Sequence, residues 1–188
     1  MADISNIGNL LPAEPLDMDI YPEAREAAPF PPAGRYTVRA PETFQFGETA
    51  AHYLSAQIDP TIVGGLFDGY TIRFTKVSAK PFKRGGVTVS YLGDYLRATG
   101  RRQNISGDPQ EQADAVEGTA NLTYDVYVDW KIFEKGTGFV VEGMDRFPSD
   151  GNGGRLPFMK SPTTKDPVTG EPKMLRANLV VKRFISAV

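Results

Sequence analysis

The segment "LTYDVYVDWKIFE", residues 122–134, constrains the fold more than any other part of the chain. Apolar and polar side chains alternate along it with a period of two, which is the pattern of a β-strand that buries one face. The predicted inner face consists of Tyr124, Val126, Val128 and Trp130. We therefore expect Trp130 in the hydrophobic core and Tyr127, which points the other way, at the surface.

Other segments show weaker strand or helix patterns. Predicted strands are "RYTVRA" (35–40), "HYLSAQIDPTIV" (52–63), "YTIRFTKV" (70–77), "GFVVEGMDRFP" (138–148) and "MLRANLVVKRFISAV" (174–188). Predicted helices are "VTVSYLGDYLRATG" (87–100) and "SGDPQEQADAVEG" (106–118). The second is expected to have Ser106 or Asp108 as its N-cap and Pro109 at its first helical position. In the strand 70–77 we expect Phe74 on the buried face and Arg73 on the opposite face. About six strands with one or two short helices predict a mainly β fold, suited to a small antiparallel barrel.

Composition places two further segments outside this barrel. Residues 1–33 are rich in acids and prolines and read as an extended N-terminal arm, followed by a domain over 34–188. The glycine- and proline-rich segment 149–172 is expected to form a long loop. No apolar run approaches the length of a membrane helix, so we expect no membrane contact and a cytoplasmic protein.

Enzymatic patterns are weak. The absence of cysteine excludes disulfides, thiolate catalysis and cysteine-ligated zinc. Asp129-Trp130-Lys131 matches only a three-residue element of metal-dependent nucleases, and no serine triad can be argued around the single histidine, His52. "DGNGG" (150–154) lacks the distal glutamate of a calcium loop and is better explained as a glycine turn. We expect neither an enzyme, nor a metal, nor a cofactor.

Charge is segregated along the chain, although the net charge is only -2. Residues 104–145 are acidic, whereas in residues 71–103 the only acid is Asp94. The cations of that basic region are Arg73, Lys76, Lys80, Lys83, Arg84, Arg97, Arg101 and Arg102. A local excess of this kind indicates a surface for a polyanion more than the net charge does.

The loop "SAKPFKRGG" (78–86) combines the two groups that hold single-stranded nucleic acid. Lys80, Lys83 and Arg84 can follow phosphates, and Phe82 can stack on a base. The alternative is a solvated hairpin tip with Phe82 tucked into the core.

Five residues outside this loop complete the candidate nucleic-acid-binding set. They are Arg73, Lys76, Arg97, Arg101 and Tyr127. The alternative for Arg73 is a surface ion pair, and Arg97 and Arg101 could instead counter the dipole of the helix that carries them. The carboxylates of Asp125 and Asp129 weaken the case for Tyr127, because they would repel phosphate.

Six segments follow one another in a distinctive order: "PPAGRYTVRA", "IVGGLFDGYTIRFTKVSAKPFKRGG", "LGDYLRATG", "VDWKIFE", "VEGMDRFP" and "LRANLVVKRFI". This order resembles a group of bacteriophage single-stranded DNA-binding proteins and covers roughly residues 30–188. The resemblance implies an OB-type barrel that coats single-stranded DNA without strong sequence preference during phage recombination or replication, in the host cytoplasm. Some proteins of this kind carry a cysteine zinc ribbon between the last two strands, whereas the corresponding segment here, 156–174, has neither cysteine nor histidine.

The expected partner is therefore single-stranded DNA, and a homo-oligomer is left open. The acidic arm is expected either to compete with DNA for the basic surface or to recruit a replication or recombination protein. A second hypothesis is a structural, scaffolding or adaptor protein of a phage particle that grips its neighbours with a β domain and the arm. The two hypotheses differ in the salt-sensitive DNA binding that only the first predicts.

Overall fold

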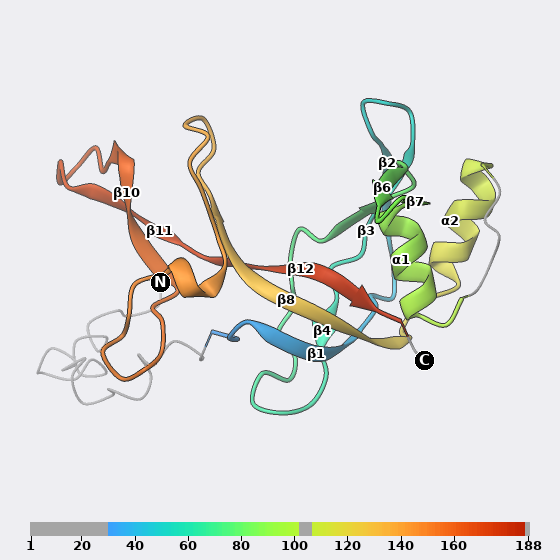
Figure 1. Ribbon diagram of the computed structural model, residues 1–188, viewed down its shortest axis with the longest axis horizontal. Helices are drawn as coiled ribbons and strands as arrows, with labels where there is room; N and C mark the ends of the chain where they lie inside the picture. Colours follow the sequence, from blue (N-terminus) through green and yellow to red (C-terminus); the bar gives the residue numbers. More distant parts are fainter. Residues whose placement is uncertain (1–29, 102–106, 187–188) are drawn as a thin grey trace, which may run out of the picture. The chain divides into compact units, whose positions relative to one another are not determined.

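Strand β8 (Thr123–Phe133) is the longest strand of the computed structural model, which describes residues 30–101 and 107–186 (Figure 1). Every second side chain from Tyr124 to Ile132 is buried. Trp130 is 3% exposed, and its indole Nε1 donates a 2.7 Å hydrogen bond to the carbonyl oxygen of Pro31. Tyr127 is 41% exposed on the opposite face. Both predictions for this strand are confirmed.

Two antiparallel sheets surround the core, and their strands range from two residues in β4 to 11 residues in β8. The elements are β1 (Gly34–Arg39), β2 (Gln45–Glu48), β3 (Leu54–Gln57), β4 (Thr61–Ile62), β5 (Lys76–Ser78), β6 (Phe82–Arg84), β7 (Val87–Val89), α1 (Tyr91–Ala98), α2 (Pro109–Glu117), β8, β9 (Val140–Glu142), the 3₁₀ helix η4 (Met144–Arg146), β10 (Phe158–Lys165), β11 (Pro172–Arg176) and β12 (Asn178–Ile185). The larger sheet has the order β12-β8-β1-β4, and β9 pairs with the C-terminal end of β8. The smaller sheet has the order β2-β3-β5.

The two sheets are continuous through the backbone between β3 and β4. Pro60 interrupts the predicted strand 52–63 between these two shorter strands, as expected for a proline that cannot donate to a ladder. Ile58 N donates to the carbonyl oxygen of Thr75, and Ile72 N donates to that of Pro60, at 2.9 and 2.8 Å. Residues 70–78 therefore run alongside residues 54–62 across both sheets.

The predicted strand 70–77 is largely wrong, since only its last two residues belong to β5. Phe74 was expected in the core, yet it is 75% exposed and has a φ of 61°. The Asp59 carboxylate accepts a hydrogen bond from Thr75 N, and the Thr75 hydroxyl donates to the carbonyl oxygen of Ile72. These tertiary and local bonds turn the backbone at Phe74, which alternation in the sequence does not show.

Both predicted helices occur, and α1 starts later than expected. Helix α1 begins at Tyr91 because residues 87–89 pair with β6, and Ser90 caps it by accepting a hydrogen bond from Gly93 N. Helix α2 begins at Pro109, as predicted, and its N-cap is Asp108, one of the two caps that the sequence offered. Helix α1 packs against β5 and β12, where Tyr95 is fully buried.

The C-terminal part differs most from expectation. The segment 149–172 was predicted to be a long loop, but it contains β10 and the first residue of β11, which form a separate two-stranded sheet. The predicted strand 174–188 divides at Ala177, whose N–H donates to the carbonyl oxygen of Pro157. The predicted strand 138–148 reduces to β9, followed by η4.

The fold is mainly β, as predicted, and has two α-helices, where the sequence indicated one or two. In the part of the chain that the structure describes, no hydrogen-bonded ladder joins β5 to β12, and so no closed barrel forms. No helix in that part is long and apolar enough to span a membrane. The predicted acidic arm lies outside the described residues up to residue 29.

Candidate nucleic-acid interface

The predicted basic loop is a β-hairpin, in which β6 pairs with β7. Gly85 and Gly86 form its turn with φ angles of 58° and 84°, a conformation that glycine adopts without steric cost. Lys83 lies opposite Thr88 and its Nζ donates a 2.7 Å hydrogen bond to the Thr88 hydroxyl. Both strands of the hairpin are mostly exposed.

Phe82 is neither free in solvent nor buried in the core. Its ring stacks against Tyr91 at the start of α1, with the centroids 4.9 Å apart and the planes inclined by 34°. The guanidinium of Arg84 lies over the Phe82 ring, 5.1 Å from its centroid. Tyr91 is 47% exposed. Phe82, Tyr91 and Arg84 thus form a partly exposed aromatic and cationic stack.

A groove beside this stack collects further lysines. We call it the basic groove; its walls are formed by Thr75, Lys76, Tyr91, Lys131, Glu142, Val180, Val181, Lys182 and Phe184. Lys76 comes from β5, Lys131 from β8 and Lys182 from β12. Glu142 on β9 forms ion pairs with Lys131, at 3.6 Å, and with Lys182. The walls of the groove therefore carry three lysines and one carboxylate, which gives it a net positive charge.

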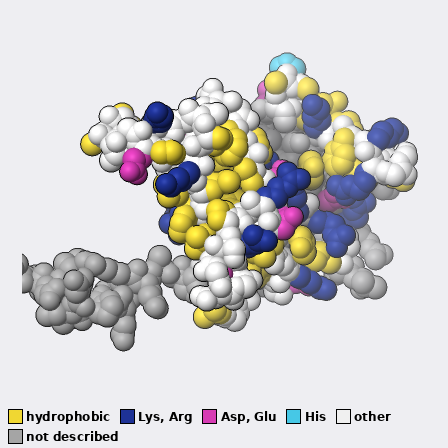
Figure 2. Space-filling view, turned by 60° about the vertical axis from the view of Figure 1, so that its left-hand side comes forward, with side chains coloured by type: hydrophobic (Ala, Val, Ile, Leu, Met, Phe, Trp, Pro, Cys, Tyr) yellow, Lys and Arg dark blue, Asp and Glu magenta, His cyan; other side chains and the backbone are white. Residues whose placement is uncertain are grey.

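Lysine and arginine side chains gather beside apolar side chains on the face shown in Figure 2. Sequence reasoning had selected Lys76 alone among the lysines of the basic groove. It missed Lys182 and had considered Lys131 only as part of a nuclease element. Nothing in the local sequence marks these two, because strand pairing of β8 with β9 and β12 brings them together.

Tyr127 lies on the outer face of the larger sheet, flanked by cations on both neighbouring strands. The register places Arg35 of β1 and Arg183 of β12 directly opposite it. The carboxylates of Asp125 and Asp129, which were expected to repel phosphate here, are both engaged in other contacts. Asp125 accepts hydrogen bonds from Arg35, at 2.5 Å, and from Thr37, and these bonds lower the pKa of the Asp125 carboxyl group.

The carboxylate of Asp129 is also hydrogen-bonded within the protein. One of its carboxylate oxygens accepts hydrogen bonds from the backbone N–H groups of Trp130 and Met144, at 2.7 and 2.9 Å. It therefore holds η4 against β8. Among the residues that the structure describes, no group of three or more histidines and acids is placed to hold a metal ion.

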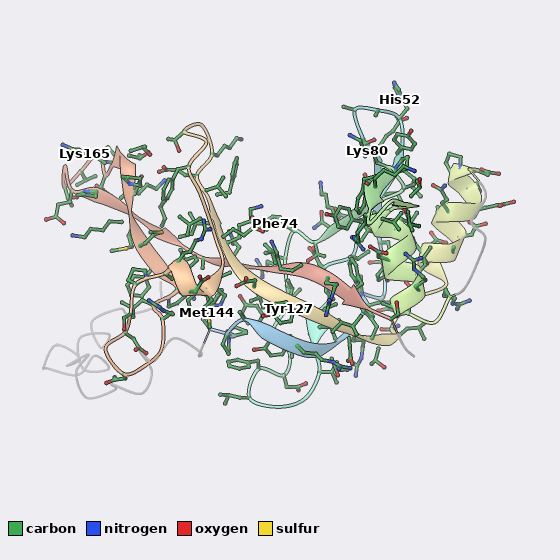
Figure 3. All side chains as sticks on the ribbon, in the orientation of Figure 1. His52, Phe74, Lys80, Tyr127, Met144 and Lys165 are labelled. Atoms are coloured by element: carbon green, nitrogen blue, oxygen red, sulfur yellow. The ribbon has the colours of Figure 1, made fainter. Side chains whose placement is uncertain are left out.

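The remaining predicted residues are dispersed. Arg73 is exposed beside Phe74, and Lys80 lies next to the β2–β3 hairpin that carries His52 (Figure 3). Arg97 shares Asp94 with Arg84, with nitrogen–oxygen distances of 2.5 and 2.7 Å. Arg101 donates to the carbonyl oxygen of Gly118 at the end of α2, which is a structural contact.

The structure thus brings Lys76, Phe82, Arg84 and Arg97 to the region of Tyr91 and α1. It does not bring Arg101 or Tyr127 there. Comparison of the chain with protein-family models, with curated proteins and with solved structures gives no match. The geometry of the side chains therefore carries the functional assignment by itself.

Proposed function

We propose that the protein binds single-stranded nucleic acid, in the first place DNA, in the basic groove. The observation that carries this proposal is the convergence of Lys76, Lys131 and Lys182 beside the partly exposed Phe82–Tyr91 stack. Cations along a groove follow the phosphates, and aromatic faces stack on bases of any identity. Lysine contacts to phosphate carry no sequence information, so we expect little sequence preference.

The strand arrangement supports an OB-like fold as part of this proposal. The strands form one continuous antiparallel series, in the order β12, β8, β1, β3–β4 and residues 70–78. Both helices come directly before β8 in the chain. A five-stranded, partly open barrel of this order is typical of OB folds, which bind oligonucleotides on the face of their second and third strands. The basic groove lies between the two ends of the series, β5 and β12.

Fluorescence anisotropy of a labelled dT oligonucleotide tests the proposal. The triple variant Lys76→Gln, Lys131→Gln, Lys182→Gln removes the three ammonium charges of the groove and keeps much of each aliphatic side chain. Three lost phosphate contacts should reduce the salt slope of log K by about 2 and, near 50 mM salt, cost more than tenfold in affinity.

A matched control changes the net charge equally. Lys160, Lys165 and Lys173 are exposed on the β10–β11 sheet, away from the basic groove, and the triple change to Gln there should leave binding nearly unaltered. Equal losses in both triple variants would mean that net charge alone drives binding. A folded wild-type protein that does not bind dT would reject the proposed function.

An adaptor or structural role within a phage particle is the second candidate function. It is favoured by exposed apolar side chains at the outer end of the larger sheet, where Phe133 and Val140 pair across β8 and β9 and are 59% and 45% exposed. Exposed apolar area of this kind is typical of protein contacts. We further propose that the acidic arm either competes with DNA for the basic surface or recruits a replication or recombination protein. Deletion of residues 1–30 should then either tighten DNA binding or abolish the contact with that protein; no change in either would reject this proposal.

A further inference from the structure

Phe74 has the most unusual backbone among the large apolar residues of the described chain. Its φ of 61° lies in the left-handed region, where a bulky side chain is rare. Its ring is 75% exposed. Both the left-handed backbone and the exposure of an aromatic ring to water cost the folded state free energy. Residues with a strained backbone of this kind concentrate at functional sites.

Contacts on both sides of Phe74 hold this conformation in place. Ile72 is fully buried and Thr75 nearly so. Thr75 N donates a 2.8 Å hydrogen bond to Asp59 Oδ1, and Thr75 Oγ1 donates to the Ile72 carbonyl oxygen at 2.9 Å. The other Asp59 oxygen accepts a 2.6 Å hydrogen bond from Gln57. The turn is therefore fixed before any ligand arrives, and the ring cannot fold back into the core.

The position of Phe74 relates it to the basic groove. The next two residues, Thr75 and Lys76, both line that groove, and the preceding residue, Arg73, is exposed. No other aromatic ring lies against Phe74 in the described part of the chain. Figure 3 marks Phe74 between the β2–β3 region, where Lys80 is labelled, and the end of the molecule that carries Lys165.

We propose that Phe74 is a base-stacking platform at the edge of the basic groove, with Arg73 and Lys76 holding the phosphates on either side of the stacked base. This inference rests on the proposed function and deepens it. The ligand is an unpaired base of a single strand, because a base inside a duplex does not offer its face. Because the backbone at Phe74 is already held in place, stacking requires no rearrangement of the chain.

The test uses variants that separate the ring from the backbone. Phe74→Asn removes the ring and keeps a residue that tolerates the left-handed region, and Phe74→Gly removes both the ring and the strain. Each should weaken dT binding at least about fivefold, the lower end for one base stack, and leave the salt slope unchanged. Neither should lower the midpoint of thermal unfolding, and Phe74→Gly should raise it.

Phe74→Trp keeps a stacking face and should bind dT as tightly as wild type. Its added indole is exposed, unlike Trp130, so quenching of its fluorescence by dT reports stacking directly. Wild-type affinity in the Asn and Gly variants would overturn the inference while leaving the proposed function intact. A change of oligomeric state in those variants, without loss of dT affinity, would also overturn it by making Phe74 a contact between copies. Failure of the wild type to bind dT would instead remove the proposed function itself.

Discussion

Replacing Tyr124 with phenylalanine should stabilise the protein, whereas the same replacement at Tyr95 should destabilise it. The two rings belong to one buried cluster with Phe184, and their centroids are 5.4 Å apart at an interplanar angle of 82°. Both are buried, with 4% and 0% of their surface exposed. The same atom is removed from similar surroundings, so any difference between the two variants reflects the hydrogen bonding of the hydroxyl groups.

Tyr95 has a defined partner. Its hydroxyl lies 2.5 Å from Thr119 Oγ1, and the single Thr119 proton is directed to the carbonyl oxygen of Val116 at 2.6 Å, so Tyr95 is the donor. Burial raises the pKa of Tyr95 to about 12, and the phenol therefore keeps this proton at neutral pH. Loss of such a bond costs about 1 kcal/mol.

Tyr124 has no partner for its buried hydroxyl among the described residues. Burial raises the pKa of this phenol well above its ordinary value, which is the expected result of removing a polar group from water. An unsatisfied buried polar group costs about 1–3 kcal/mol, and Tyr124→Phe removes that cost while keeping the ring contacts. The two variants should thus differ by about 2–4 kcal/mol.

Urea and thermal unfolding of both variants measure this difference. For a domain of this size, each kcal/mol shifts the unfolding midpoint by about 2–4 °C, so the shifts should have opposite signs and be easily resolved. The double variant shows whether the two neighbouring sites are coupled. Equal destabilisation by both changes would refute the reasoning, because it would mean that Tyr124 has a hydrogen-bond partner.

The remaining predictions concern two other polar contacts. Burial acts to raise the pKa of Glu134, but hydrogen bonds from the hydroxyl groups of Thr163, Thr137 and Ser161 override it and lower the pKa to about 2. Because the folded-state pKa is depressed from 4.5, the stabilisation is present above pH 4.5 and lost as the pH falls towards 2. Glu134→Gln should lower the midpoint of thermal unfolding at pH 7 and flatten its pH dependence in that window; an unchanged profile would contradict this role. Arg101→Ala should lower the same midpoint and leave dT affinity unchanged, since its guanidinium is bonded to Gly118. Loss of affinity at an unchanged midpoint would return Arg101 to the binding surface.

Local patterns predicted those features whose causes are local. Alternation in 122–134 depends only on the pleat of one strand, and it correctly placed Trp130 inside and Tyr127 outside. The cap of α2 depends on Asp108 and Pro109, which are adjacent in the chain. The turn after Arg84 has an equally local cause, because Gly85 and Gly86 permit it regardless of what surrounds them.

Features that depend on distant contacts were missed. The segment 149–172 has the composition of a loop, yet β10 is held in place by hydrogen bonds from Ser161 and Thr163 to Glu134, which lies more than 25 residues earlier. Phe74 has the spacing of a core residue, and the carboxylate of Asp59 turns it outward.

By itself, therefore, the sequence determined a mainly β chain with one or two helices, a basic middle region and an aromatic residue beside its lysines. Only the tertiary structure decided which cations share a surface. Lys131 and Lys182 join Lys76 because β8 pairs with both β9 and β12, and the β12 register shifts at Lys182, while Arg101 contacts the end of α2. The physical reason is that a strand pattern specifies which side of a strand is buried, whereas the choice of neighbouring strand is made by contacts between residues far apart in the chain.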